Sequence, residues 1–218
     1  MSSKNAIVFI DGNNWYHNVK AWFSKPGDID LQKLADFVCK KFNLNLLEIR
    51  YYNSVPSISD GELMYYRHMQ FLSNLEKQGI IVITRKLQRN STKEIIAERK
   101  EILNSLDICK DCKPLIEAGF IDSVGAIEKK EKGIDVSIVV DMISKCIIEK
   151  QCDCCILVSG DADFVPAMEL IKKSKGEVIS SMVPMGYSNE LKSKFRYLIL
   201  KRYDLTNQCM KSYQDIKK

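Results

Sequence analysis

The sequence lacks the long apolar segments that membrane and exported proteins need. None of its apolar runs reaches the roughly 18 residues of a membrane-spanning helix. Residues Met1 to Asn5 lead straight into a short apolar run at 6–10, where a signal peptide would have a longer apolar core. We therefore expect a cytoplasmic protein with no membrane partner.

A glycine-rich phosphate loop and internal repeats are also missing. The first apolar run is followed by Asp11-Gly12-Asn13-Asn14, which lacks the G-x-G-x-x-G pattern of dinucleotide-binding domains. No repeat or low-complexity segment interrupts the 218 residues, of which 45% are hydrophobic and 28% charged. This composition is typical of an ordinary globule, and the length suits one domain better than two small ones.

Cysteine, in contrast, is abundant. The eight cysteines occupy positions 39, 109, 112, 146, 152, 154, 155 and 209. Without an export signal we expect reduced thiols, with Cys39 and Cys146 as small core residues on apolar helix faces. Cys109 and Cys112 form a CxxC pair, and the cysteines at 152–155 would complete four zinc ligands only if the fold brought them close. Structural zinc at Cys109 and Cys112 is therefore disfavoured.

Short apolar runs alternate with helical patterns along the chain. Strands are predicted at residues 6–10, 46–52, 80–84, 155–158 and 177–183. Helices are predicted after Asp11 to about 23, and at 31–42, 62–78, 135–148, 163–175 and 191–200. Because the apolar runs show no polar alternation, they are typical of strands buried on both faces of a parallel sheet. The pattern predicts an α/β fold with a central parallel sheet of about five strands.

Residues 88 to about 132 interrupt this alternation. Ser91-Thr92-Lys93-Glu94 has the spacing of a helix capping box, and the CxxC pair and a charged run at 128–132 follow it. We interpret the segment as an insertion in a crossover, and a mobile flap is one form that it could take. We therefore expect a single domain at 1–204 that contains this insertion, and a C-terminal tail at 205–218.

Carboxylates stand where strands end and where one helix begins. Asp11 follows the strand at 6–10, Asp161 and Asp163 follow the strand at 155–158, and Asp135 opens the helix at 135–148. A crossover helix runs antiparallel to the strands, so it begins at their carboxyl edge, where open α/β sheets bind ligands. Helix capping explains Asp163 or Asn14 taken singly. Four acids at one edge, however, repel one another unless a cation is present.

The acid cluster indicates a site for a hard metal ion. Oxygen ligands suit Mg²⁺ or Mn²⁺ better than zinc, and such ions activate water for phosphodiester hydrolysis. On a helical wheel, Asp135 shares one face with Val139, Met142 and Cys146, whereas Asp141 falls on the other face. The wheel therefore predicts that Asp141 points away from the core and from the metal site.

The net charge of +5 is small, so the distribution of basic residues matters more than their number. Two stretches are rich in them: Arg85, Lys86 and Arg89, and then Lys192, Lys194, Arg196, Lys201 and Arg202. Such residues usually lie on a solvated face, but beside an acidic pocket they bind the phosphates of nucleic acids. We expect Lys192, Lys194 and Arg196 to contact the phosphates of a nucleic acid.

Three motifs together resemble the NYN domain family of the PIN-like nuclease superfamily. They are Phe9-Ile10-Asp11-Gly12-Asn13-Asn14, Lys132-Gly133-Ile134-Asp135-Val136 and Ser159-Gly160-Asp161-Ala162-Asp163-Phe164. The resemblance covers about residues 5 to 204. It implies a three-layer α/β/α Rossmann-like domain and a metal-dependent endoribonuclease with RNA as its partner. The site residues that it implies are Asp11, Asn14, Asp135, Asp161 and Asp163. Asp141 also matches an acid often seen in the family's helix, in conflict with the wheel.

Other functions stay open. A haloacid-dehalogenase-like phosphatase needs a second Asp two residues after its nucleophile, where this chain has Asn13. A non-catalytic RNA-binding or regulatory member of the family would keep the fold, but a pure phosphate binder gains nothing from a pocket of negative charge. The sequence does not indicate which metal or RNA is used or whether cleavage is endo- or exonucleolytic, and it leaves a homodimer open.

Overall fold

The structure is a computed structural model that describes residues 3–58, 61–86, 88–89, 92–122, 129–130 and 133–212. The chain divides into two compact units. One comprises Met1–Arg85 and Gly133–Lys218, and the other comprises Lys86–Lys132. The predicted insertion at 88–132 falls within the second unit.

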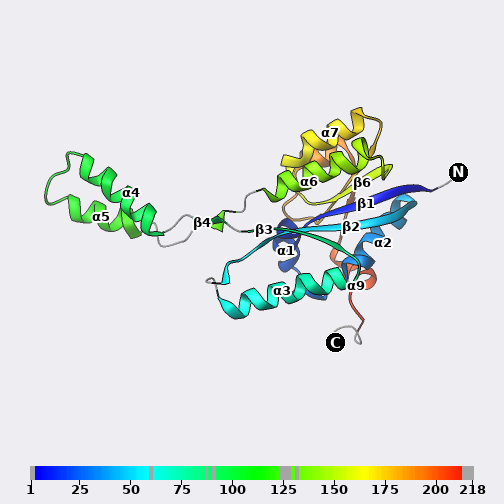
Figure 1. Cartoon of the computed structure of the whole chain (residues 1–218), viewed down its shortest axis with the longest axis horizontal. Coiled ribbons are helices and arrows are strands. Elements are labelled where there is room, and N and C mark those ends of the chain that lie inside the picture. The colour runs from blue at the N-terminus through cyan, green and yellow to red at the C-terminus, as the bar shows by residue number, and fades with distance from the viewer. Residues whose placement is uncertain are drawn as a thin grey trace. The chain divides into compact units, whose positions relative to one another are not determined.

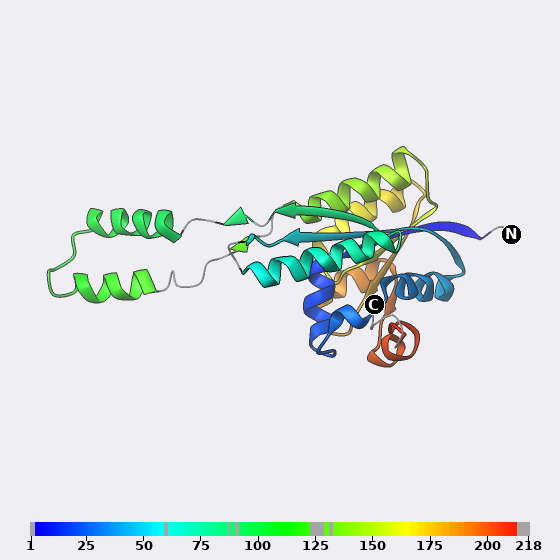
Figure 2. The same ribbon diagram turned by 60° about the horizontal axis from the view of Figure 1, so that its bottom comes forward.

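Among the described residues, six strands form one sheet in the first unit, in the order β3-β2-β1-β6-β7-β8. They are β1 (Lys4–Asp11), β2 (Leu44–Val55), β3 (Ile81–Lys86), β6 (Cys154–Val158), β7 (Glu177–Met182) and β8 (Arg196–Ile199). The pairs β1–β2, β1–β6, β6–β7 and β7–β8 are parallel, and β3 runs in the direction of β2 (Figure 2). After β1, the chain adds β2 and β3 on one side of it and then β6, β7 and β8 on the other. The junction of β1 and β6 is therefore a topological switch point, where doubly wound proteins bind ligands.

Helices cover both faces of this sheet (Figure 1). One face carries α1 (Gly12–Lys20), α2 (Leu31–Phe42), α3 (Glu62–Lys77) and α9 (Arg202–Gln208). The other carries α6 (Ile134–Ile143), α7 (Val165–Lys173) and α8 (Asn189–Lys194). Ala6, Val8 and Ile10 of β1 enter the first core and Ile7 and Phe9 the second, which explains the continuous apolar run. The predicted three-layer α/β/α fold is confirmed. Within the described ranges, no helix is long and apolar enough to cross a membrane.

The predicted helix at 191–200 is wrong in its second half. Helix α8 ends at Lys194, the backbone of Phe195 is extended (φ −127°, ψ 160°), and residues 196–199 form the edge strand β8. Arg196 and Tyr197 are exposed, so this strand lacks the apolar run that marks the central strands. The described sheet therefore has six strands instead of about five.

The end of the chain packs more tightly than the predicted tail at 205–218 suggests. The boundary at 204 falls inside α9, whose Leu205 is fully buried, and Cys209 is also part of the core. The backbone N–H of Lys211 donates to the carbonyl of Asp28 at 2.9 Å. The fold thus extends at least to this residue, and 213–218 lie outside the described residues.

The second unit contains α4 (Thr92–Ser105), α5 (Lys113–Asp122) and a two-stranded antiparallel pair, β4 (Gln88–Arg89) and β5 (Lys129–Lys130). Cys109 and Cys112 are exposed in the turn between the two helices. Ser91 of the predicted capping box and most of the charged run at 128–132 lie outside the described residues.

Candidate active site

Asp11 lies at the end of β1, at the switch point of the sheet. Its side chain is only 4% exposed. Oδ1 accepts a hydrogen bond from the backbone N–H of Asn14 (3.1 Å), and Oδ2 accepts one from the hydroxyl of Ser159 (3.0 Å). The first contact makes Asp11 the N-cap of α1, where the helix dipole favours a negative charge. A buried carboxylate thus joins the carboxyl ends of β1 and β6.

The segment after β6 extends this hydrogen-bonded chain. The hydroxyl of Ser159 accepts the N–H of Asp161 (3.2 Å), and Oδ1 of Asp161 accepts the N–H of Asp163 (3.0 Å). Asp161 is therefore the N-cap of the short 3-10 helix η4 (Ala162–Phe164), which leads into α7. The helix start that the sequence predicted at Asp163 is two residues late. Asp163 is consequently exposed and not occupied as a cap.

Asn14 holds α1 against the loop that follows β6. Its Oδ1 accepts the backbone N–H of Gly160 (3.0 Å) and the side-chain amide of Asn18 (2.9 Å). A Cβ at Gly160 would collide with the carbonyl oxygen of Gly186, so the loop at 184–188 passes too close for any side chain. The N–H of Ser188 donates to the carbonyl of Gly160 at 2.9 Å. This loop therefore lies directly beside the segment after β6 that carries Asp161 and Asp163.

Asp135 lies in the first turn of α6, and its side chain is exposed. Helix α6 contacts β1, β2, α7 and η4. The guanidinium Nε of Arg85, near the end of β3, donates to the hydroxyl of Ser137 (3.3 Å), which in turn donates to the carbonyl of Gly133 (2.8 Å). The first turns of α6 thus carry an exposed acid at Asp135 and a serine that binds a cation.

The four aspartates do not form one tight group. Among the described residues, one group of three or more Cys, His, Asp or Glu side chains has its ligand atoms within 4.8 Å of one another, and it consists of cysteines. Asp11, Asp161 and Asp163 are linked through Ser159 and the backbone. Mg²⁺ retains several waters and needs only one or two carboxylates directly. The oxygen donors present therefore fit a hydrated Mg²⁺ or Mn²⁺ better than an ion enclosed by protein.

The helical wheel placed Asp141 on the wrong side of α6. The buried residues of this helix are Ile134, Ile138 and Met142, while Asp135 is exposed. The apolar arc is therefore rotated relative to the prediction, and it brings Asp141 toward β2. The error lies in the choice of the buried face, because Asp141 comes seven residues, about two turns, after the buried Ile134 and so lies on the same side of α6.

Asp141 belongs to a half-buried charged network on β2. Its Oδ2 accepts hydrogen bonds from Nη2 and Nε of Arg50 (2.9 and 3.1 Å) and from the hydroxyl of Tyr52 (2.7 Å). Arg50 also pairs with Glu48 at 2.6 Å. Burial, together with the hydrogen bond to Asp141, raises the pKa of Tyr52 above its ordinary value, so the phenol remains a donor. Tyr52 stands opposite Asp11 in the β1–β2 register, so the network borders the candidate site.

The three basic residues predicted to bind RNA do not gather at the acids. Lys194 pairs with Glu169 and Glu190, both at 2.7 Å. Arg196 is the first residue of β8 and lies 3.7 Å from Glu177, at the amino edge of the sheet. Lys192 lies 6.0 Å from the ring of Tyr187, which belongs to the loop beside Gly160. Of the three, Lys192 is thus the best connected to the acidic edge.

Several residues of this region were missed in the sequence. Ser159 is the first residue of the motif that contains Asp161 and Asp163, and its position at the end of a predicted strand could have identified it as a site residue. Arg50 and Tyr52 alternate along β2, which indicates a shared face, but nothing indicated that this face would meet Asp141. No pattern in the sequence marks Tyr187.

Fold and acidic edge together define a doubly wound α/β protein with its candidate site at the switch point. The family model of the NYN domain matches residues 5–200, so the chain belongs to the NYN domain family, as the motifs predicted. NYN domains are part of the PIN-like nuclease superfamily. This membership does not favour a phosphatase or a dinucleotide-binding protein.

Comparison with solved structures supports the fold. The crystal structure of VPA0982, a protein of unknown function from Vibrio parahaemolyticus RIMD 2210633, is similar with a TM-score of 0.55 and 16% identity over 97% of this chain and 100% of that one. A short-chain dehydrogenase from Oenococcus oeni PSU-1 has a TM-score of only 0.27 and 12% identity, over 92% of this chain and 86% of that one. No curated protein sequence matches the chain.

Proposed function

We propose that this protein is a metal-dependent ribonuclease that hydrolyses RNA phosphodiester bonds at the carboxyl edge of its sheet. The observation that carries the proposal is the hydrogen-bonded chain from Asp11 through Ser159 to Asp161 and Asp163. It arranges carboxylates around the switch point, where folds of this type bind their ligands. Membership of the NYN family supports the same conclusion.

The four acids share one role in this proposal, and Asn14 has another. Asp11, Asp135, Asp161 and Asp163 hold the ion, and Asn14 fixes the loop that carries two of them. A bound Mg²⁺ or Mn²⁺ supplies an activated water and stabilises the leaving oxygen. Because Asp11 is already fixed by two hydrogen bonds, it needs little reorganisation when an ion binds.

RNA needs cations beside the acids as well as a metal. Lys192 remains a candidate from the sequence, supported by its packing on Tyr187 next to the loop at Gly160. Arg85 is a further candidate, since it is exposed and bonded to the first turn of α6. Both would contact phosphates, which position RNA without reading its sequence.

The test is an assay of purified full-length protein on single-stranded and structured RNA with Mn²⁺, Mg²⁺ or EDTA. We expect cleavage with either metal, none in EDTA, and none in Asp163→Asn. Asp36→Asn is the matched control, because Asp36 is an exposed acid on α2, away from the carboxyl edge. Cleavage that persists in EDTA would contradict the mechanism.

A non-catalytic RNA-binding protein is the second candidate. The observation that favours it is the absence, among the described side chains, of three acids within 4.8 Å of one another. In that case RNA binds in a salt-dependent manner, no metal supports cleavage, and Asp163→Asn strengthens binding because it removes a negative charge. Binding and cleavage measured on the same preparations separate the two candidates.

A further inference from the structure

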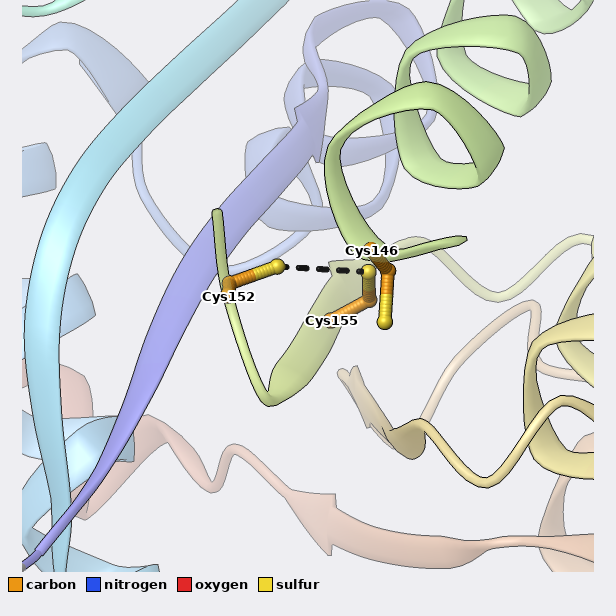
Figure 3. Close-up of side chains that lie close together, drawn as sticks. All are labelled: Cys146, Cys152 and Cys155. Carbon is orange, nitrogen blue, oxygen red and sulfur yellow. Dashed lines mark hydrogen bonds between the residues drawn. The ribbon is translucent and has the colours of Figure 1, made fainter. Parts of the chain in front are cut away.

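Three buried cysteines meet at the amino end of β6. Cys146 lies in the π-helix η3 (Ser144–Ile148), Cys152 precedes β6, and Cys155 is its second residue. Figure 3 shows their side chains close together at the junction of the helix and the strand. Their sulfur atoms all lie within 4.8 Å of one another, and the Cys152–Cys155 distance is 4.0 Å. They are 8%, 6% and 0% exposed, respectively.

The separation of these sulfur atoms matches that of thiolates around one metal ion. With Zn–S bonds of about 2.3 Å and tetrahedral angles, neighbouring sulfurs are about 3.8 Å apart. Cys152 and Cys155 have CxxC spacing, which suits two ligands of one ion, and Cys146 precedes them by six residues. These cysteines were expected only as possible partners of Cys109 and Cys112, although Cys152 and Cys155 have CxxC spacing of their own.

The local backbone is shaped around the sulfur of Cys146. The N–H of Glu149 donates to the carbonyl of Ser144 (2.8 Å), which makes the π-turn, and such turns are frequent at functional sites. A Cβ at Gly176 would lie 2.6 Å from the sulfur of Cys146, so glycine leaves that sulfur its space. Both features accommodate Cys146 in the cluster.

We propose that Cys146, Cys152 and Cys155 bind one thiophilic divalent cation of the zinc type through three thiolates. The fourth position belongs to a solvent ligand, which the slight exposure of Cys146 and Cys152 admits. The ion would hold the end of α6 against the start of β6. It is separate from the acids, because Ser159 lies four residues beyond Cys155, about 13 Å along the strand.

The experiment titrates reduced, EDTA-treated full-length protein with Zn²⁺ and with Cd²⁺ under anaerobic conditions. Binding of Cd²⁺ is followed by the ultraviolet absorption of cadmium thiolates, and binding of Zn²⁺ by the melting temperature. We expect one equivalent per chain, a higher melting temperature with Zn²⁺, and loss of both effects in Cys146→Ala and Cys152→Ala. These two positions are chosen because they are less deeply buried than Cys155.

Two controls separate this site from the other cysteines. Cys154→Ala is the matched variant, because Cys154 is buried next to Cys155 but packs on the opposite face of the sheet. The double variant Cys109→Ser and Cys112→Ser removes the exposed pair. Both should retain stoichiometric binding, with circular dichroism to verify folding.

Three results overturn the proposal. The first is metal binding that survives in the folded Cys146→Ala and Cys152→Ala variants. The second is metal binding that is lost in the Cys109→Ser, Cys112→Ser double variant. The third is a wild-type chain that binds neither ion but forms a Cys152–Cys155 disulfide under mild oxidation. None of these results bears on RNA cleavage, because the readout is metal binding at the other end of β6.

Discussion

The hydroxyl of Ser159 donates a 3.0 Å hydrogen bond to the buried carboxylate of Asp11, and so ties together the ends of two adjacent strands, β1 and β6. Ser159 is itself buried. It also accepts the N–H of Asp161, so one small side chain positions two acids. We expect Ser159→Ala to reduce metal-dependent cleavage through a higher metal requirement, and Ser159→Thr to retain more activity. A titration of activity against Mn²⁺ concentration measures the effect, and an unchanged requirement would contradict it.

Asp11→Asn should abolish cleavage without harming the fold. Asparagine keeps the N-cap of α1 but not the negative charge, and relief of repulsion with Asp161 and Asp163 offsets any loss. We therefore expect a melting temperature without metal that is equal to or above that of the wild type. A clearly lower value would mean that the acids do not repel one another at this edge.

The chemistry of the products tests the metal mechanism directly. Attack by an activated water leaves a 5′-phosphate, whereas attack by the ribose 2′-hydroxyl leaves a 2′,3′-cyclic phosphate. We expect 5′-phosphate ends, and activity that EDTA removes and Mn²⁺ or Mg²⁺ restores. Mass spectrometry of the fragments distinguishes the two kinds of end.

Asp135 and Asp141 should respond differently to substitution. Asp135→Asn should lose metal-dependent cleavage and keep its stability, because the side chain is exposed. Asp141→Asn should lower stability by about 1–3 kcal/mol, since it weakens a half-buried contact with Arg50 and Tyr52, while activity falls only modestly. Urea denaturation and single-turnover cleavage measure the two effects. A folded Asp141 variant as inactive as the Asp135 variant would place Asp141 in the site, as the family resemblance suggests.

Salt dependence of RNA binding distinguishes the basic residues. Lys192→Ala should weaken binding and lower the slope of log K against log salt by about one at most. Lys194→Ala should change the slope less, because Glu169 and Glu190 already neutralise this lysine. Equal slopes for wild type and the Lys192 variant would assign Lys192 to a solvated surface.

His68 should make the fold sensitive to acid. Burial lowers the pKa of this histidine below 6.5, and among the described residues its Nε2 is buried with no hydrogen-bond partner. Below about pH 6.5 the unfolded chain therefore binds a proton that the folded chain resists, so stability falls as the pH drops. His68→Leu should flatten this dependence between about pH 7 and 5, as measured by urea denaturation. An identical pH profile in the variant would contradict the prediction.

The central strands and their acids were predictable because their patterns are local. The run from Ala6 to Ile10 is apolar at every position, and a strand buried on both faces needs no further context. Asp11 and Asp161 follow from the same logic, since each comes at or shortly after the carboxyl end of such a strand.

Features that depend on tertiary contacts were not predictable in this way. Arg196 and Tyr197 of strand β8 are exposed, so the strand has no continuous apolar run that distinguishes it from the helix before it. What makes it a strand is its pairing with β7, which is a tertiary contact. The orientation of Asp141 depends on which side of α6 faces the sheet, and the apolar pattern does not decide this, because Val136 and Val140 are apolar yet exposed. The cysteine cluster requires the end of α6 to meet the start of β6, although the spacing of Cys152 and Cys155 was visible.

The place of β6 beside β1 also determines when the acidic edge is completed during protein synthesis. Asp11 and Ser159 are 148 residues apart in the chain, and most of the intervening residues must leave the ribosome before the two can meet. Until then β1 pairs only with β2, and its second edge is open to wrong partners. Folding should therefore be slow and dependent on late contacts. A nascent chain that stops before β6 carries Asp11 but no assembled site, so premature termination should not release an active nuclease.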